Sequence, residues 1–283
     1  IYVDDILIMS SSEVEIERLK SCLCEKFEVK DLGDLKYCLG VEFERMDNYL
    51  GISQRGYIDD LLQKFDMSHC NPVSTPLELE INLTIDEGED ACPKNIPYQE
   101  LIGGLMYLSM GTRPDITNAV SYLSQFSSCF RESHWKAAKR VLRYLKGTRD
   151  LNLVYSRGSA SESPVMYTDA DWGSCLVDRK SYTGYVFLIG GTALSWGSRK
   201  QRSVAFSSTE AEYMALSDAA KDAIYMKKLL KSLGVNLETI ILKNDNIGAE
   251  KLSGNPVFHA RSKHIDIRHH FVRDCVKKKG DCN

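Results

Sequence analysis

Three acidic residues, each beside a predicted strand or helix, constrain the fold of this chain most strongly. Asp169 ends a β-prone run, Val165–Thr168. Glu212 lies in the first turn of a predicted long helix, and Asp245 follows an apolar β-prone run. Carboxylates at such positions of an α/β unit can meet at one edge of a sheet and bind two divalent cations. The pattern therefore predicts an α/β unit with a metal site at a sheet edge.

The elements around these residues fit that order. A hairpin is predicted from Tyr185–Ile189 and Ala193–Trp196, with its turn at Gly190-Gly191. The long helix is predicted from Thr209 to Leu233, and the last strand is Ile240–Leu242. Antiparallel strands followed by a helix and a further strand are typical of an α/β arrangement.

Each acidic residue also has a simpler explanation. Thr209 and Glu212 fit a capping box, in which both side chains satisfy free helix amides. Asp245 fits a helix N-cap, and Asp169 or Asp171 fits a turn. The joint order and spacing of the three carboxylates favour the metal site over these separate explanations.

Asp4 and Asp5 form a second candidate site. They lie between two β-prone runs, residues 1–3 and 6–9, which predicts a hairpin with two carboxylates at its tip. Two such charges repel each other, and a divalent cation removes that repulsion. A solvated turn is the alternative, because Asp is a favoured turn residue. The motif alone leaves both explanations open.

The middle of the chain is predicted to be mainly helical. The stretch Cys70–Pro97 is rich in proline and carries an acidic run, which indicates an exposed connector. A second polar joint is expected over Ser156–Ser163. The helical patterns cover Ser12–Phe27, Tyr57–Phe65, Tyr98–Met110, Asp115–Phe126 and His134–Leu145, and one strand is predicted over Tyr37–Phe43.

Composition narrows the class of protein. With 43% hydrophobic and 27% charged residues, the 283-residue chain is typical of a soluble protein of two domains. No apolar stretch reaches the length of a membrane span, about 18 residues, so no membrane partner and an intracellular location are expected. Nine cysteines without a CxxC pair predict neither zinc nor a disulfide framework. The net charge of -3 leaves nucleic-acid binding to local basic clusters.

Several motifs resemble parts of retrotransposon polyproteins. The segment Tyr2-Val3-Asp4-Asp5 resembles the palm motif of reverse transcriptases. The segments Thr168–Trp172 and Ser208–Tyr213, with Asp245, resemble the TDADW, STEAEY and strand-end Asp motifs of copia-type ribonuclease H domains. The segment Leu142–Thr148 is similar to the linker before that domain. The chain is therefore identified as a member of the copia-type Pol polyprotein family over nearly its whole length.

The resemblance implies an α/β (α+β) fold in three parts. A partial reverse transcriptase palm and post-palm region is expected over 1–70. A linker and helical connection is expected over 71–160. A ribonuclease H-like domain, truncated at its C-terminus, is expected over 161–283. The remainder of the Pol polyprotein is the implied protein partner, and a cytoplasmic virus-like particle and the nucleus are both compatible locations.

The resemblance also implies the chemistry. Asp169, Glu212 and Asp245 are the expected catalytic and metal-binding residues of a two-metal hydrolysis of the RNA strand of an RNA/DNA hybrid, with Mg²⁺ (or Mn²⁺) as the ion. Asp4 and Asp5 are the expected catalytic and metal-binding residues of the polymerase site, which acts on primer-template nucleic acid.

Basic residues supply the expected nucleic-acid contacts. One group precedes the long helix and the other lies near the end of the chain: Arg199, Lys200, Arg202, Arg261, Lys263 and His264. A solvated basic helix is the alternative for the second group. Zinc binding by His264, His269 and His270 is not expected, because the chain offers neither a helical i,i+4 pair nor a Cys partner.

Two ligands known in the family are expected to lie outside this chain. One is a palm carboxylate upstream of Tyr2, and the other is a fourth ribonuclease H carboxylate in a helix after Asn283. We therefore expect no reverse transcription and weak nuclease activity from this chain alone. The rival interpretation is a catalytically inactive relic that binds nucleic acid. A DNA transposase or integrase of related fold does not explain Tyr2-Val3-Asp4-Asp5.

Overall fold

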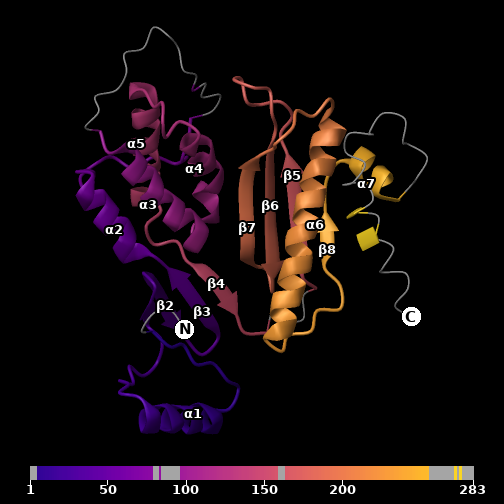
Figure 1. Ribbon diagram of the computed structural model, residues 1–283. Helices are drawn as coiled ribbons and strands as arrows, with labels where there is room; N and C mark the ends of the chain where they lie inside the picture. The colour runs from indigo at the N-terminus through magenta and orange to yellow at the C-terminus, as the bar shows by residue number, and fades with distance from the viewer. Residues whose placement is uncertain are drawn as a thin grey trace.

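The computed structural model describes residues 5–78, 83, 96–158, 163–254, 271–272 and 274–275. These residues form two four-stranded sheets, each with helices packed beside it (Figure 1). The expected mixture of helices and strands is confirmed.

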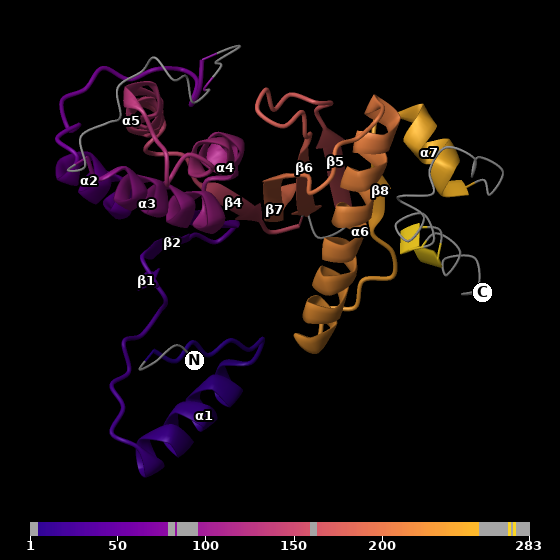
Figure 2. The same ribbon diagram turned by 45° about the horizontal axis from the view of Figure 1, so that its top comes forward.

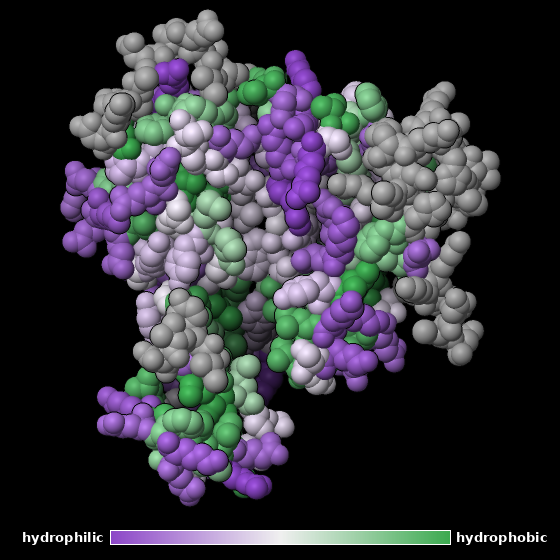
Figure 3. Space-filling model, viewed as in Figure 1, coloured by the Kyte–Doolittle hydropathy of each residue, from purple (hydrophilic) through white to green (hydrophobic). Residues whose placement is uncertain are grey.

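The first helix, α1 (Glu13–Lys26), begins where the sequence predicts. Ser12 caps it, because the Ser12 Oγ accepts a hydrogen bond from the backbone of Glu15 at 3.4 Å. The helix has no buried residue, and Figures 2 and 3 show it apart from the second sheet with apolar side chains on the surface around it. The strand predicted over residues 6–9 is wrong: no ladder partner lies beside it in the described part of the chain, and only an isolated bridge forms at Asp5.

The first sheet is antiparallel, in the order β1-β2-β3-β4. Its strands are β1 (Tyr37–Cys38), β2 (Val41–Arg45), β3 (Tyr49–Ser53) and β4 (Leu153–Ser156). The single strand predicted over Tyr37–Phe43 is wrong, because Leu39 and Gly40 have φ angles of 51° and 72° and turn the chain back on itself. Positive φ at both central residues is the pattern of a type I′ hairpin turn.

The helical part consists of α2 (Arg55–Lys64), α3 (Tyr98–Gly111), the 3-10 helix η1 (Pro114–Ile116), α4 (Thr117–Ser124) and α5 (Glu132–Gly147). One apolar core joins these helices, with Leu61 of α2, Leu105 of α3 and Leu142 of α5 among its buried members. The predicted domain boundary at residue 70 crosses this shared core. The division into domains therefore stays a prediction.

The basic side of α5 is bound to the segment 70–78. Arg140 forms an ion pair with Glu78 at 3.0 Å. Arg143 and Lys146 donate to backbone carbonyls at the start of that segment, at 2.8 and 2.7 Å. These three cations therefore hold the connector against the helical core.

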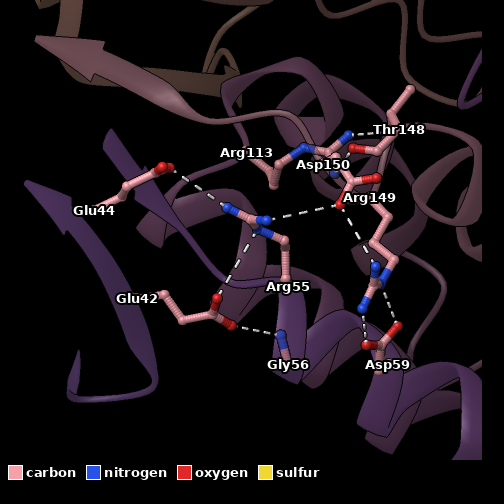
Figure 4. Close-up of polar contacts among 9 residues, drawn as sticks. All are labelled: Glu42, Glu44, Arg55, Gly56, Asp59, Arg113, Thr148, Arg149 and Asp150. Atoms are coloured by element: carbon pink, nitrogen blue, oxygen red, sulfur yellow. Dashed lines mark hydrogen bonds and ion pairs between the residues drawn. The ribbon is translucent and has the colours of Figure 1, made fainter. Parts of the chain in front are cut away.

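Ion pairs join α2 to the first sheet and to the segment after α5 (Figure 4). Arg55, at the start of α2, lies 4.0 Å from Glu42 and 3.8 Å from Glu44 of β2. Arg149 forms a bidentate pair with Asp59 at 2.6 and 2.5 Å. Bidentate pairs of this kind fix orientation as well as adding energy. The return of the chain from α5 to β4 is thereby positioned on α2.

The second sheet has the order β7-β6-β5-β8. Its strands are β5 (Val165–Ala170), β6 (Tyr182–Ile189), β7 (Thr192–Lys200) and β8 (Ile241–Lys243). Strands β5 and β8 are parallel, and the other pairs are antiparallel. The predicted hairpin turn is confirmed, because Gly190 and Gly191 have φ angles of 57° and 77°.

One long helix covers a face of this sheet. α6 (Ser208–Ser232) packs on the face that carries Met166 and Phe187, with small residues such as Ala219 in the contact. Small side chains let the helix lie close to the strands. A shorter helix, α7 (Ile247–Gly254), follows β8 and packs beside α6. The long helix predicted from Thr209 to Leu233 is confirmed to within one residue at each end.

The helical part adjoins the second sheet at β7. In Figures 1 and 2 α4 lies beside β7, while α6 lies on the opposite side of the sheet. The Trp196 indole N–H donates to the Ser109 carbonyl at 2.6 Å, and the Asn118 amide donates to the Ser198 hydroxyl at 3.3 Å. Contacts from both α3 and α4 therefore fix the helical part on this strand.

Candidate metal centre

The parallel pairing of β5 and β8 brings two of the predicted carboxylates together. Tyr167 lies opposite Lys243, so Asp169 and Asp245, each two residues further on, leave the same edge of the sheet. Glu212 reaches this edge from the first turns of α6. One carboxylate oxygen from each of the three residues lies within 4.8 Å of the others. The predicted convergence is confirmed, whereas the metal-binding and catalytic roles remain predictions.

The sequence offered Thr209 and Glu212 as the capping box of α6, but other residues cap this helix. Ser207 is the N-cap, and its Oγ accepts from the backbone of Glu210 at 3.2 Å. The Glu210 carboxylate accepts from the backbone of Phe206 at 3.0 Å. The capping box of Thr209 and Glu212 is therefore wrong. The cap leaves the Glu212 side chain available for the carboxylate cluster.

Asp245 is likewise not a helix cap. Asn246 caps α7, because its side-chain oxygen accepts from the backbone of Ala249 at 3.0 Å and its carbonyl from Glu250 at 3.1 Å. The sequence places Asp245 one residue too early for that role. Its carboxylate is exposed beside Asp169.

Asp169 and Asp171, which lie close together near the end of β5, have different roles. Asp171 accepts from the backbone of Tyr182 at 2.5 Å and from the hydroxyl of Ser174, so it closes the connection between β5 and β6. Asp169 instead joins the cluster. The turn explanation therefore applies to Asp171 and fails for Asp169.

Glu212 is the buried member of the cluster, with 6% of its surface exposed. Burial raises the pKa of Glu212 to about 7, and the neighbouring Asp169 carboxylate adds to the rise, against a hydrogen bond from Asn244 that lowers it. Buried carboxylates near a like charge are stabilised by a bound cation. The cluster thus has the electrostatic character of a cation site.

Asn244 positions the cluster and was not assigned a role from the sequence. Its amide donates to the Glu212 carboxylate at 2.8 Å and to the Thr168 carbonyl at 3.4 Å. Its oxygen accepts from the backbone of Asn246 at 2.9 Å. These bonds tie α6, β5 and the start of α7 to one side chain. The only sequence signal was its place directly before Asp245.

The three carboxylates fit a hard divalent cation. All the donor atoms are carboxylate oxygens, which suit Mg²⁺ and Mn²⁺, and among the residues that the structure describes neither His nor Cys takes part in the cluster. Asp169, Glu212 and Asp245 are the residues that would hold such an ion.

A cavity of about 650 Å³ opens beside the cluster. Asp169 and Asp245 lie at one end of it, and Lys243 beside them is the one cation among its lining residues in the described part of the chain. The cavity crosses the sheet to β7 and to the helical part, where Thr117 and Asn118 of α4 line it. Carboxylates that can hold a cation therefore face a cavity large enough for part of a polymer chain.

The predicted basic contacts lie in different places. Arg199 lies on the α6 face of the sheet, 5.7 Å from the ring centre of Tyr185. Lys200 is bound to Asp178 at 2.8 Å and to Gln125 at 3.0 Å, and Arg202 is exposed. Their nucleic-acid contacts remain predictions, as do those of three residues outside the described part of the chain, Arg261, Lys263 and His264.

The second candidate site is described only in part. Asp4 lies outside the described residues, and Asp5 is exposed. The first described residues, from Asp5 to the start of α1, lie apart from β5 and β8 in Figures 1 and 2. Three histidines considered for zinc binding also lie outside the described residues: His264, His269 and His270.

The chain is a mixed α and β protein with a carboxylate cluster at a sheet edge, and comparison with known proteins identifies its family. Residues 1–79 match the model of the family "Reverse transcriptase (RNA-dependent DNA polymerase)". The chain is 39% identical over 289 residues to the retrovirus-related Pol polyprotein from transposon TNT 1-94 of Nicotiana tabacum, an alignment covering 98% of this chain and 21% of the relative.

Two further relatives extend this result. The Pol polyprotein from transposon RE2 of Arabidopsis thaliana is 40% identical over 278 residues, which cover 98% of this chain and 19% of the relative. A transposon Ty5-1 protein of Saccharomyces cerevisiae is 34% identical over 227 residues, which cover 78% of this chain and 72% of the relative. The chain belongs to the copia-type retrotransposon Pol polyprotein family. It spans about a fifth of the length of the two plant polyproteins.

In the described part of the chain, no helix is both long enough and apolar enough to cross a membrane.

Proposed function

We propose that residues 161–283 form a ribonuclease H-like domain, which cleaves the RNA strand of RNA/DNA hybrids within a retrotransposon Pol polyprotein. The observation that carries the proposal is the meeting of Asp169, Glu212 and Asp245 beside a cavity that Asp169 and Asp245 line. The family membership supports it, because copying RNA into DNA produces such hybrids.

The residues of the chain have distinct parts in this proposal. Two bound Mg²⁺ ions would activate water and stabilise the leaving 3′ oxygen. Asp169 and Asp245 present exposed oxygens toward the cavity, while Glu212 supplies the buried oxygen held by Asn244. Recognition by shape and 2′-hydroxyls gives such a site little preference for base sequence.

The remaining parts of the chain are proposed as polymerase regions. Residues 1–70 represent palm and post-palm structure, with Asp4 and Asp5 as metal ligands, and residues 71–160 form a linker and helical connection. Primer-template nucleic acid is the proposed substrate of that part, and the rest of the Pol polyprotein is the proposed partner. An intracellular location accords with both activities.

Cleavage of a labelled hybrid tests the proposed nuclease. We expect a longer Pol protein that contains this chain to cut the RNA strand of an RNA/DNA hybrid in Mg²⁺, and to leave single-stranded RNA and DNA duplex intact. EDTA should stop the cleavage, since the carboxylates act through the cation.

The same cleavage assay can also contradict the proposed nuclease. A folded longer protein that binds the hybrid but cuts nothing in Mg²⁺ or Mn²⁺ would replace the nuclease with the alternative, a protein that only binds nucleic acid. Circular dichroism and hybrid binding on the same preparation show that the protein is folded.

A further inference from the structure

A buried amide follows β7 at the sheet edge where the carboxylate cluster lies. Gln201 has 5% of its surface exposed. Strands β5, β7 and β8 run in the same direction, because β5 and β7 are both antiparallel to β6 and β8 is parallel to β5. Gln201 therefore leaves the sheet at the same edge as Asp169 and Asp245.

The Gln201 side chain joins the start of β6 to the start of α6. Its Nε2 donates one hydrogen bond to the Thr183 hydroxyl at 3.0 Å and another to the Ala211 carbonyl at 2.9 Å. Its backbone N–H donates to the Ser181 carbonyl, just before β6, at 2.8 Å. All three partners are fully buried. This one residue thus fixes the first turn of α6 relative to β6.

The two side-chain bonds end next to two members of the cluster. Thr183 pairs with Ala170, the residue after Asp169. Ala211 is the residue before Glu212. The Gln201 amide therefore sets how far the helix turn of Glu212 lies from the strand of Asp169.

The amide is not the most stabilising choice at this position. A carbonyl only accepts hydrogen bonds, so Nε2 must face Ala211, and the Gln201 Oε1 then has no hydrogen-bond partner among the described residues. An unpaired buried acceptor lowers stability, and a Met of similar length would have none. Stability alone therefore does not account for Gln201, whereas control of the position of Glu212 does.

The cation that the cluster selects depends on the spacing of its oxygens. One oxygen from each carboxylate lies within 4.8 Å of the others. Mg²⁺ needs a near-octahedral set of oxygens at about 2.0–2.1 Å, whereas Ca²⁺ accepts variable geometry at about 2.3–2.6 Å. A small displacement of the first turn of α6 therefore affects Mg²⁺ binding more than Ca²⁺ binding.

We propose that Gln201 is a positioning residue of the metal centre, which holds Glu212 at the spacing from Asp169 that Mg²⁺ requires. This inference rests on the proposed function, because it takes the carboxylate cluster as a cation site. Gln201 acts through the backbone before Glu212 rather than as a ligand. Its effect is a preference of the cluster for Mg²⁺ over Ca²⁺.

Titration calorimetry with Mg²⁺ and with Ca²⁺ on the 283-residue chain tests this inference. Gln201→Met keeps the length of the side chain and removes both donors. It should raise the Kd for Mg²⁺ by about tenfold, the lower end of the range for residues that orient metal ligands. The Kd for Ca²⁺ should change much less, since Ca²⁺ accepts variable geometry. Binding that persists in Asp169→Asn lies elsewhere on the chain and is subtracted.

Gln54→Met is the matched control. Gln54 is also a buried amide, with 1% of its surface exposed, and it accepts from the Thr112 hydroxyl at 2.9 Å. It lies at the start of α2, outside the second sheet. The same chemical change there should leave the Kd of both cations unchanged.

Thr183→Val makes a smaller change at the same contact. It removes the hydroxyl that accepts from Gln201 and keeps the bond to Ala211, so Mg²⁺ binding should weaken by less than in Gln201→Met. Thr183→Ser keeps the hydroxyl and should bind Mg²⁺ as the parent does.

Three results would overturn the inference: Mg²⁺ binding by Gln201→Met equal to that of the parent, equal weakening of Mg²⁺ and Ca²⁺ in that variant, or the same change in Gln54→Met. If Gln201→Met does not fold, unchanged Mg²⁺ binding by Thr183→Val has the same meaning. A parent that binds neither cation at the cluster would overturn the proposed metal centre and the inference with it. A parent that binds Mg²⁺ but cuts no hybrid would overturn the nuclease alone.

Discussion

Asp169→Asn is expected to lower Mg²⁺-dependent cleavage of an RNA/DNA hybrid by about a thousandfold or more, in a longer Pol protein that contains this chain. A ligated ion stabilises the charge of the transition state by several kcal/mol, and about 1.4 kcal/mol corresponds to each tenfold in rate. Asn keeps the shape of Asp169 but removes the charge that the exposed oxygens contribute to the cluster. Initial rates on labelled hybrid measure the effect.

Asp171→Asn is the matched control. It changes the same side chain in the same way two residues further on, but Asp171 accepts hydrogen bonds from Tyr182 and Ser174 and is not part of the cluster. An Asn oxygen can still accept from the Tyr182 backbone, so most of the activity should remain. Equal losses in the two variants, or full activity in Asp169→Asn, would remove Asp169 from the metal centre.

Glu212→Gln is expected to make the metal-free protein more stable above pH 7, although it removes a ligand. The Glu212 pKa is raised from 4.5 to about 7 by burial and by Asp169. Between these two values the folded protein holds a proton that the unfolded chain has lost, so stability falls as pH rises through this window. The Gln side chain has no charge to bury. It should therefore gain up to about 3 kcal/mol over the parent at pH 8 and nothing below pH 4.5.

Adding Mg²⁺ should make the parent protein more stable than the Glu212→Gln variant. Mg²⁺ stabilises whichever protein binds it in the folded state, so the parent should gain Tm on its addition while Glu212→Gln should not. Thermal unfolding from pH 4 to pH 9, with EDTA and with Mg²⁺, measures both effects. Glu250→Gln, at an exposed residue of α7, is the matched control and should follow the parent in each buffer. A Glu212→Gln variant that is less stable than the parent at pH 8 in EDTA would contradict a raised pKa for the buried Glu212 carboxylate.

The parts of the fold that follow local rules could be predicted from the sequence. Ser12 caps α1, and Gly190-Gly191 forms the turn of the β6–β7 hairpin, because both depend on side chains and φ angles of adjacent residues. The meeting of Asp169 with Asp245 was also predictable, since parallel strands leave the same edge of a sheet.

Other parts depend on contacts between distant segments. The pairing of β4 with β3 joins residues about a hundred positions apart, and no local sequence pattern predicts it. The hairpin turn at Leu39-Gly40 was missed because Leu is rare at positive φ.

In the candidate site, too, the features that depend on contacts between distant residues were not predicted from the sequence. Asn244 was missed because its partner Glu212 lies 32 residues away, and the wall formed by α4 was missed because helix packing on β7 sets it. The caps of α6 and α7 were each displaced by one or two residues from the simplest assignment. Because other residues cap the two helices, the side chains of Glu212 and Asp245 take part in the cluster instead.

The position of a bound Mn²⁺ ion tests the metal centre most directly. Crystals of the 283-residue chain grown with Mn²⁺ should give an anomalous difference peak within about 2.5 Å of carboxylate oxygens from Asp169, Glu212 and Asp245. The peak should vanish in Glu212→Gln and persist in Asp171→Asn. An ordered cluster with no peak at saturating Mn²⁺, or a peak bound by other residues, would contradict the metal centre on which the proposed nuclease rests.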